Sequence, residues 1–558
     1  MDNSIKELIK ASLREGCRNF KKIGISGKHL PPIFISQPKR KEWGDLSTNL
    51  PFLLQKESGK DISKIGKLLV SWLENEDFLA RAEFISPGFI NLFIAPSYLK
   101  QTIKKIIVQK EKFPRFSFGN GKRVQVEFVS ANPTGPLHVG HGRAAALGDS
   151  LANILEKAGY KIEREYYIND VGSQIERLAR SVWARLQEVE GAGVPFPNDG
   201  YKGLYLIDIA KEAKDAFGEK LKHEESKQKL FDLLGKFTVA KILKEIKKDL
   251  DEFGVRFDRW FKESSLYENG EIPRTISSIK DRGYVYEKGG ALWFKTSPFL
   301  KDEEDRVLKR KSGEYTYFAS DIAYHRVKFS RGLHQVIDIW GADHIGYVPR
   351  MKAAIQALGY PEGSLQVIIY QFVNLKRGEK SISASTREGE FVSLRDVLRE
   401  VGRDVARFFF LSRTQDSHLD FDLDLAKKQS PENPVFYIQY AYARICSILR
   451  KAESKGITIN NLEEAKLDLL VAPEERELMR ELALLPDQVR EAAESLEPHR
   501  LTTYLQELAS LFHQFYTRHR VISKDKDLTF ARLTLIKAVK LAIKDVLGLL
   551  GISAPQKM

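Results

Sequence analysis

Residues 123–168 read RVQVEFVSANPTGPLHVGHGRAAALGDSLANILEKAGYKIEREYYI. The first part, VQVEFV, has the composition of a β-strand, and the following SANPTGP is rich in residues that form turns. A helical pattern then runs from about Val139 to Ala158, and KIEREYYI provides a second strand. This succession of strand, turn, helix and strand is typical of a parallel sheet built from βαβ units.

The same alternation continues further along the chain. Apolar runs at QVIDIWG (335–341) and LQVIIYQFV (365–373) alternate with helical patterns at about 346–358 and 394–401. They predict a multidomain α/β protein with a Rossmann-like, doubly wound parallel sheet at its core. Residues 173–280 are helical and charged and too long for a loop, so we expect them to form an inserted helical subdomain.

Two further domains flank this core. Residues 1–110 mix helical patterns with the strand-like pieces ARAEFIS and FINLFIA, which predicts a small α+β domain. Residues 432–558 show helical periodicity throughout and predict an all-α bundle. The α/β core is then left with residues 120–172 and 281–413.

The charge of the chain favours a polyanionic partner. The 558 residues include 89 Lys and Arg against 75 Asp and Glu, a formal charge of +14. Nucleic acid is such a partner, although a merely charged, soluble surface is an alternative interpretation. Only two cysteines occur, Cys17 and Cys446, so neither a disulfide framework nor a four-cysteine zinc site is expected. Two cysteines fit a reducing cytoplasm, so we expect a cytoplasmic location. Because charges interrupt the apolar runs, we also expect no membrane span.

The two histidines of HVGH, His138 and His141, have three interpretations. A metal site needs further ligands, and the neighbouring sequence offers neither an HExxH pattern nor a cysteine. Packed core histidines are a second possibility. The third is a nucleotide site, because a helix N-terminus attracts phosphate and imidazoles at i and i+3 project from one side of the turn. Gly140 between them leaves room for a base to approach the backbone.

The stretch resembles a known family. HVGH is similar to the HxGH signature of class I aminoacyl-tRNA synthetases, and VEFVSANPTGPLHVGHGRAAALGD resembles arginyl-tRNA synthetases. The resemblance extends over nearly the whole chain, through EWGDLSTNLPFLL, ISPGFINLFIA, YYINDVGSQIERLARSV, ALWFKTSPFLKDEEDRVL, YTYFASDIAYHRVKF, IDIWGADHIGYVPRMKAAIQALGY, DVARFFFLSR and SPENPVFYIQYAYARICSILRK.

The resemblance implies an arginine–tRNA ligase. The arginine carboxylate attacks the α-phosphate of ATP, and a terminal ribose hydroxyl of tRNA(Arg) then attacks the arginyl-adenylate. His138, Gly140 and His141 are implied to bind ATP, with Mg²⁺ bound chiefly to the nucleotide and no structural zinc. Both histidines are expected to assist catalysis as donors to phosphate oxygens, since such displacements depend on positioning and on matched donors.

A guanidinium pocket should offer carboxylates and planar acceptors. By resemblance, the matching positions are Glu127 and Asn132 around the turn, and Tyr317 and Asp321 in YFASD. A strand-to-helix break in TYFASDIAYH would direct Asp321 outward at the helix start. An N-cap aspartate is the alternative there, and both roles can coexist.

The segment GADHIG follows an apolar strand, at the end where doubly wound sheets bind ligands. Gly341 would permit close approach of adenosine, with Asp343 and His344 as its polar contacts. A tight turn with a capping residue is the alternative interpretation.

The second class I signature is a lysine-bearing loop, usually KMSKS. Here the flanking sequence aligns SASTR, residues 383–387, with it, so Ser383 and Ala384 stand where Lys and Met would be. Some relatives that lack this lysine carry one in the turn before HxGH, a position that is Gly135 here. Both usual sources of the cation are therefore missing from the sequence.

A replacement cation is expected close to the same loop. Arg387 is the expected catalytic cation, with Lys376, Arg377 or Lys380 as upstream alternatives, and Ser385 is expected to contact ATP. A solvated basic loop is the competing interpretation. We also expect that Gly135→Lys is neutral or improves the rate.

The resemblance implies tRNA contacts in both flanking domains. Phe89 and Asn91 in PGFIN are the matching positions in the N-terminal domain, although packing at a strand edge is an equal alternative. In the C-terminal bundle, FYIQYAYAR, HQFYTRHR and Tyr504 offer aromatic and basic side chains for unpaired bases, although most aromatics at helical spacing should be core. We expect a monomer. A non-catalytic tRNA-binding paralogue is the alternative function.

Overall fold

The computed structural model describes residues 4–19, 30–192, 194–218, 220–223, 226–301, 303–378, 380–382, 392–457 and 461–558. The chain forms two compact units. Unit 1 comprises Met1–Phe118, Ser430–Leu549 and Ser553–Met558, and unit 2 comprises Gly119–Gln429 with Leu550–Ile552. Each unit therefore contains segments that are distant in the sequence.

Unit 2 is built on a five-stranded parallel sheet, as the sequence predicts. Its strand order is β11-β10-β4-β5-β6, and all four pairings are parallel. The order reverses beside the central strand β4, which is the position at which doubly wound sheets bind ligands. The strands are β4 (Arg123–Glu127), β5 (Lys161–Ile168), β6 (Arg259–Lys262), β10 (Gln335–Gly341) and β11 (Leu365–Tyr370).

The central strand ends early. Glu127, its last residue, pairs with Asp338 of β10 and Glu165 of β5. The two neighbouring strands continue to Gly341 and Ile168. The chain that leaves β4 therefore turns between two longer strands, and its side chains are confined to the carboxyl edge of the sheet.

Helix α5 (Val139–Lys157) follows this turn and packs against the sheet. Its small residues AAALG allow a close approach, because a Cβ atom at Gly148 would lie only 2.1 Å from the ring of Phe128. The helix is buried along most of its length. Its first residues are therefore fixed in position relative to the end of β4.

The helical insertion is shorter than the predicted 173–280. Helices α6 (Ser173–Val189), α7 (Tyr205–Phe217) and α9 (Lys227–Glu252) pack together as expected, with the short α8 (Lys220–His223) against α7. The prediction is wrong beyond them, because β6 joins the parallel sheet. Charged residues at both ends of its four-residue RWFK hide this edge strand in the sequence.

The segment after β6 belongs to the core. Helices α10 (Ser264–Glu268) and α11 (Glu271–Asp281) pack against α12 (Tyr317–Ser330), beside the antiparallel strands β7 (Val285–Lys288), β8 (Ala291–Phe294) and β9 (Arg306–Lys309). The remaining elements of unit 2 are η4 (Ala342–Tyr347), α13 (Val348–Ala357), β12 (Val373–Arg377), β13 (Lys380–Ile382), α14 (Leu394–Val401), α15 (Arg403–Leu411), β14 (Leu419–Asp422) and α16 (Leu423–Lys427).

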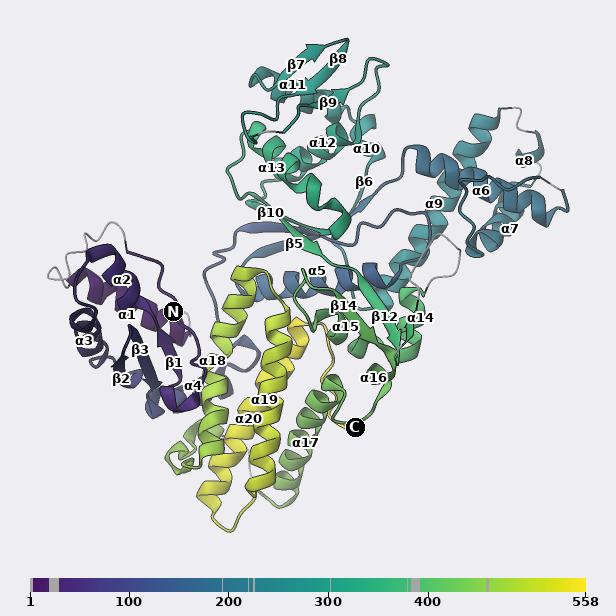
Figure 1. The fold of residues 1–558 in the computed structure, drawn as a ribbon. Helices are drawn as coiled ribbons and strands as arrows, with labels where there is room; N and C mark the ends of the chain where they lie inside the picture. The colour runs from purple at the N-terminus through teal and green to yellow at the C-terminus, as the bar shows by residue number, and fades with distance from the viewer. Residues whose placement is uncertain are drawn as a thin grey trace. The chain divides into compact units, whose positions relative to one another are not determined.

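Unit 1 joins the predicted N-terminal and C-terminal domains. The N-terminal part has an antiparallel sheet of order β1-β3-β2, and the C-terminal part is the bundle of long helices in Figure 1. Helix α4, which follows the small sheet, packs against α18 and α20. The elements are α1 (Ile5–Asn19), η2 (Lys41–Trp43), β1 (Leu46–Thr48), α2 (Leu50–Ser58), α3 (Ile62–Leu73), β2 (Leu79–Ile85), β3 (Phe89–Ile94), α4 (Pro96–Gln109), η3 (Lys110–Lys112), α17 (Pro434–Ser454), η5 (Leu462–Glu464), η6 (Leu467–Leu469), α18 (Pro473–Ser495), α19 (His499–Arg518) and α20 (Lys526–Leu549).

Among the described residues, no helix combines the length and apolarity that crossing a membrane requires.

Candidate active site

The signature histidines begin helix α5. His138 is the N-cap residue, and its Nδ1 accepts a hydrogen bond from the backbone N–H of Gly140 at 3.1 Å. The Nδ1 atom of His141 lies 3.3 Å from the backbone nitrogen of His138 and accepts its hydrogen. The two imidazoles stack with ring centroids 3.7 Å apart. They therefore share one side of the first helical turn, as the spacing predicts.

These contacts define the donors that the histidines offer. Burial lowers the pKa of His138, and burial together with the charge of His138 lowers the pKa of His141 well below its usual value. Both rings are therefore neutral near pH 7. Since each Nδ1 accepts a backbone hydrogen, the ring proton resides on Nε2. The helix thus presents two neutral N–H donors at its positive end, where phosphate binds well.

Gly140 has a local reason to be glycine. A Cβ atom there would lie 2.9 Å from Cε1 of His138, so a side chain would displace the capping imidazole. Asn132, earlier in the same turn, is exposed. The turn therefore brings an exposed amide and two histidines to the same carboxyl edge of the sheet.

A cluster of acidic and phenolic groups lies at the same edge. Asp321 accepts a hydrogen bond from Tyr347 Oη at 2.6 Å, and burial raises its pKa. Glu263 follows β6 and is 2% exposed. Burial, together with the charge of Asp321, raises the pKa of Glu263 to about 7 against the effect of the hydrogen bond from Tyr167. Two carboxylates that repel each other in this way favour a cation between them.

The expectation that Asp321 could cap its helix is wrong. Thr316 is the N-cap of α12, with its hydroxyl 3.4 Å from the Ala319 nitrogen, and Asp321 lies one turn inside the helix. Tyr317, the first residue of α12, is 60% exposed. A Cβ atom at Gly172 would lie 3.3 Å from the Tyr317 hydroxyl, which places that hydroxyl beside the loop after β5.

Glu127 is largely buried and has hydrogen-bond partners within the protein. It is 7% exposed, and its carboxylate accepts hydrogen bonds from Lys328 Nζ at 2.5 Å and Ser130 Oγ at 2.8 Å. Lys328 Nζ also donates a hydrogen bond to Oδ1 of Asp338 at 2.7 Å. The other carboxylate oxygen of Asp338, Oδ2, is hydrogen-bonded to Nε2 of His325. Burial raises the pKa of Glu127. Although burial also opposes the ionisation of Asp338, Lys328 and His325 outweigh it and lower that pKa to about 2.

The GADHIG segment lies where the sequence predicts, directly after β10. Gly341 is the N-cap of η4, but no side chain caps this helix, so the capping alternative is not supported. A Cβ atom at Gly341 would lie 2.6 Å from Oδ1 of Asp343. Asp343 and His344 are exposed and 3.5 Å apart, and are available to a ligand at this edge.

The segment that aligns with the lysine-bearing loop, residues 383–387, is not among the described residues. Ser385 and Arg387 lie outside the described residues. Upstream of them, Lys376 forms an ion pair with Asp420 and Arg377 forms one with Glu400, each at 2.6 Å. Two of the three upstream alternatives therefore have acidic partners in this structure, and the third, Lys380, is exposed.

Residues Glu263, Tyr347 and Lys328 were missed by sequence reasoning. Glu263 follows a strand that was assigned to the helical insertion. Tyr347 could have been found, because it directly follows GADHIG. Lys328 falls within the resembling segment YTYFASDIAYHRVKF, but only the fold shows that it is fully buried between two carboxylates.

The residues of unit 1 that are expected to contact RNA differ in their exposure. Phe89 is 46% exposed, whereas Asn91 is 7% exposed in the middle strand of its sheet. On the bundle, the Arg444 guanidinium lies 5.1 Å from the ring of Tyr440 and 5.5 Å from the ring of Tyr516. These two tyrosines, exposed by more than a third, provide an aromatic and basic surface.

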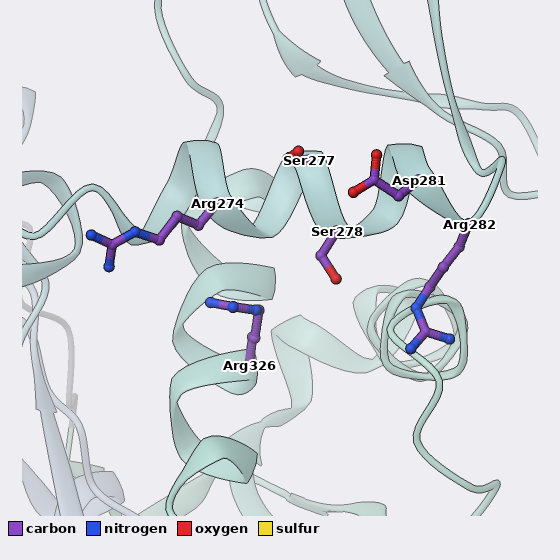
Figure 2. A pocket seen from close by; sticks show the side chains of 6 residues that line it. All are labelled: Arg274, Ser277, Ser278, Asp281, Arg282 and Arg326. Atoms are coloured by element: carbon purple, nitrogen blue, oxygen red, sulfur yellow. The ribbon is translucent and has the colours of Figure 1, made fainter.

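A separate basic hollow lies along helices α11 and α12. In Figure 2, Arg274 extends from α11 and Arg326 from α12, and Asp281 lies on α11 with Arg274. Both arginines pair with Glu271, at 2.8 and 3.0 Å. Glu271 and Asp281 therefore compensate much of the positive charge of this hollow.

The comparisons with known proteins agree with the fold. The family model described as "tRNA synthetases class I (R), catalytic domain" matches residues 102–420. "Arginyl tRNA synthetase N terminal domain" matches residues 3–94, and "DALR anticodon binding domain" matches residues 438–558. With the histidine pair at the switch point of the sheet, these matches define a class I aminoacyl-tRNA synthetase.

Similar curated relatives narrow the class. The arginine–tRNA ligase of Syntrophotalea carbinolica is 48% identical over 95% of each chain, and that of Desulfosudis oleivorans is 48% identical over 99% of this chain and all of its own. The Thermus thermophilus arginyl-tRNA synthetase structure shares the fold, with a TM-score of 0.79 at 24% identity over 99% of this chain and 100% of that one. The chain belongs to the arginyl-tRNA synthetase family.

Proposed function

We propose that this protein is an arginine–tRNA ligase that activates L-arginine with ATP and transfers it to the terminal ribose of tRNA(Arg), releasing AMP and diphosphate. One observation carries the proposal. Two neutral Nε2–H donors on the first turn of α5 share the carboxyl edge of the sheet with the Asp321–Glu263 cluster, which suits a guanidinium. A phosphate site and an arginine site therefore lie on one sheet edge.

In the first step an arginine carboxylate oxygen attacks the α-phosphorus, and the bond to the diphosphate oxygen breaks. His138 and His141 donate to phosphate oxygens as negative charge develops on them, which stabilises the transition state without a proton transfer from the rings. Asp343 and His344 are proposed to contact the adenosine portion, beside Gly341.

The arginine side chain is proposed to lie between Asp321 and Glu263, with Tyr317 and Asn132 nearby. A guanidinium is always charged and forms paired hydrogen bonds with carboxylates. Its arrival would lower the raised pKa of Glu263, so that both carboxylates are ionised in the complex. Glu127, held by Lys328, is proposed to complete the amino-acid side of the site.

In the second step a terminal ribose hydroxyl of the tRNA attacks the arginyl carbonyl, and AMP leaves. Phe89 and the Tyr440–Arg444–Tyr516 surface are proposed to stack on unpaired bases; Asn91, buried here, would need to become exposed to reach RNA. Mg²⁺ on the ATP phosphates, a monomeric state and a cytoplasmic location remain predictions.

The decisive experiment is charging of purified tRNA(Arg), together with arginine-dependent exchange of labelled diphosphate into ATP, with and without tRNA. Arginine-specific charging is expected. Absence of charging and of exchange under every condition would instead favour the non-catalytic tRNA-binding paralogue.

A further inference from the structure

A side chain of the helical insertion reaches the signature turn. Tyr205, the first residue of α7, donates a hydrogen bond from its hydroxyl to the backbone carbonyl of Thr134. Thr134 lies between Asn132 and His138, two residues of the proposed active site. The contact therefore joins the insertion to the loop that carries both the arginine side and the ATP side.

Other hydrogen bonds hold the two ends of the same turn. Tyr166 donates to the carbonyl of Ala131 at 2.9 Å, and the backbone N–H of Leu394 donates to the carbonyl of Leu137 at 2.8 Å. The Thr134 carbonyl lies midway between these two along the chain. Tyr205 thus fixes the centre of a turn whose two ends are held by the sheet and by α14.

The segment before Tyr205 is itself held against α6. The Tyr201 backbone N–H donates to Ser181 Oγ at 2.9 Å, and Arg185 donates to the Lys202 carbonyl at 2.8 Å. Arg185 also stacks over Phe196, with its guanidinium carbon 4.8 Å from the ring centroid. Because several anchors restrain this segment, the start of α7 and hence the hydroxyl have a defined position.

Gly135 makes room for the tyrosine. A Cβ atom at Gly135 would lie 3.2 Å from Tyr205 Oη, whereas the next ring atoms, Cζ and Cε1, would be 3.5 and 3.7 Å away. The hydroxyl is therefore the atom that a side chain at position 135 would meet first. This is the position at which some relatives carry the lysine that this chain lacks.

We propose that Tyr205 is a positioning residue for arginine activation, which holds the turn from Asn132 to His138 in its reactive geometry from within the helical insertion. The inference rests on the proposed arginine–tRNA ligase function. It changes the expectation for Gly135→Lys: the new side chain would displace the Tyr205 hydroxyl, so we now expect this variant to lose activity.

The test is a double-mutant cycle of Tyr205→Phe and Gly135→Ala, read by steady-state arginine-dependent diphosphate exchange into ATP, with tRNA(Arg) present throughout. Each single variant is expected to lower kcat about 5- to 10-fold, the effect of one hydrogen bond, with the thermal midpoint retained. The double variant should be no slower than Tyr205→Phe alone, because the added Cβ then has no hydroxyl to displace. Tyr201→Phe, in the same segment, is the matched control and should retain activity.

Two results would overturn the positioning role: wild-type kcat in Tyr205→Phe, or losses that simply multiply in the double variant. A wild-type protein that neither charges tRNA(Arg) nor supports exchange would count against the ligase function itself. An active wild-type protein with an unaffected Tyr205→Phe variant would reject only the role of Tyr205.

Discussion

The ammonium group of Lys328 lies 2.5 Å from the Glu127 carboxylate and ties helix α12 to the end of the central strand. Lys328 is fully buried and also contacts Asp338 on the neighbouring strand. A single cation thus bridges the two strands at which the strand order of the sheet reverses. Its charge compensates Glu127, which belongs to the proposed active site, and Asp338 beside it.

Replacing Lys328 with Met should therefore cost stability as well as activity. The change leaves Glu127 and Asp338 buried without their cation, and breaking such a pair costs about 3–5 kcal/mol. Urea unfolding of the variant would measure this loss. Lys311→Met, at an exposed lysine, is the control and should change the free energy of unfolding little. Equal stability of the two variants would contradict the importance of the buried bridge.

Variants of His141 can separate its two ring nitrogens. Asn places an amide near the position of Nδ1 and removes the Nε2–H donor, whereas Gln can place an amide nitrogen near Nε2. We expect His141→Asn to lower kcat for arginine activation about 10²- to 10³-fold and His141→Gln to lower it less. Diphosphate exchange measures both rates, with His334→Asn as an exposed control. The reverse order of the two variants would show that Nδ1 matters more.

The charge of Asp321 should determine the choice of arginine over its neutral analogue citrulline. Asp321→Asn keeps an acceptor for Tyr347 but removes the negative charge, and charged hydrogen bonds of this kind correspond to about 10- to 100-fold in binding. We expect KM for arginine to rise by that factor and the preference over citrulline to fall with it. Glu268→Gln, at an exposed position of α10, is the control. Undiminished discrimination would remove Asp321 from the guanidinium pocket.

Arg387 remains the predicted source of the missing loop cation. Arg387→Ala should lower the rate of arginine activation, because a positive charge on the transition state is lost. Lys376→Ala should have a smaller effect, since Lys376 pairs with Asp420 in the structure. Single-turnover formation of arginyl-adenylate distinguishes chemistry from product release. Unchanged single-turnover kinetics in Arg387→Ala would reject its role.

Asp487 should make unit 1 more stable in mild acid than in base. Burial raises its pKa to about 6, although Ser4 and the Lys6 backbone N–H donate to it. A raised carboxyl pKa means that stability is full below the unfolded value near 4 and is lost as the pH rises through 6. Asp487→Asn stays neutral, so we expect it to exceed the wild type by up to about 3 kcal/mol at pH 8 and to match it at low pH.

Urea unfolding at pH 8 and at low pH would measure this difference. Asp468→Asn in the same unit is the contrasting control, because Lys100 lowers the pKa of exposed Asp468 and its loss should slightly reduce stability at pH 8. A pH-independent effect of Asp487→Asn would show that its packing, and not its charge, matters.

Local patterns were sufficient for much of the architecture. The strand, turn and helix around HVGH formed as predicted, because apolar periodicity, turn-forming residues and capping act over a few residues. The strand RWFK was missed because it is a short edge strand with charged ends, which only pairing with β5 stabilises. The N-cap of α12 was also misjudged, since Thr316 is selected by backbone geometry that the sequence leaves open.

The sequence by itself determined the βαβ core, the position of His138 and His141 at a helix N-terminus, and the family. Only the tertiary structure decided which distant residues complete the site: Glu263 beside Asp321, Lys328 beneath Glu127, and Tyr205 over the signature turn. The physical reason is the distance along the chain over which each kind of interaction acts. Helix starts and turns depend on neighbours along the chain, whereas buried ion pairs and hydrogen bonds between separate elements depend on where the sheet brings their ends together.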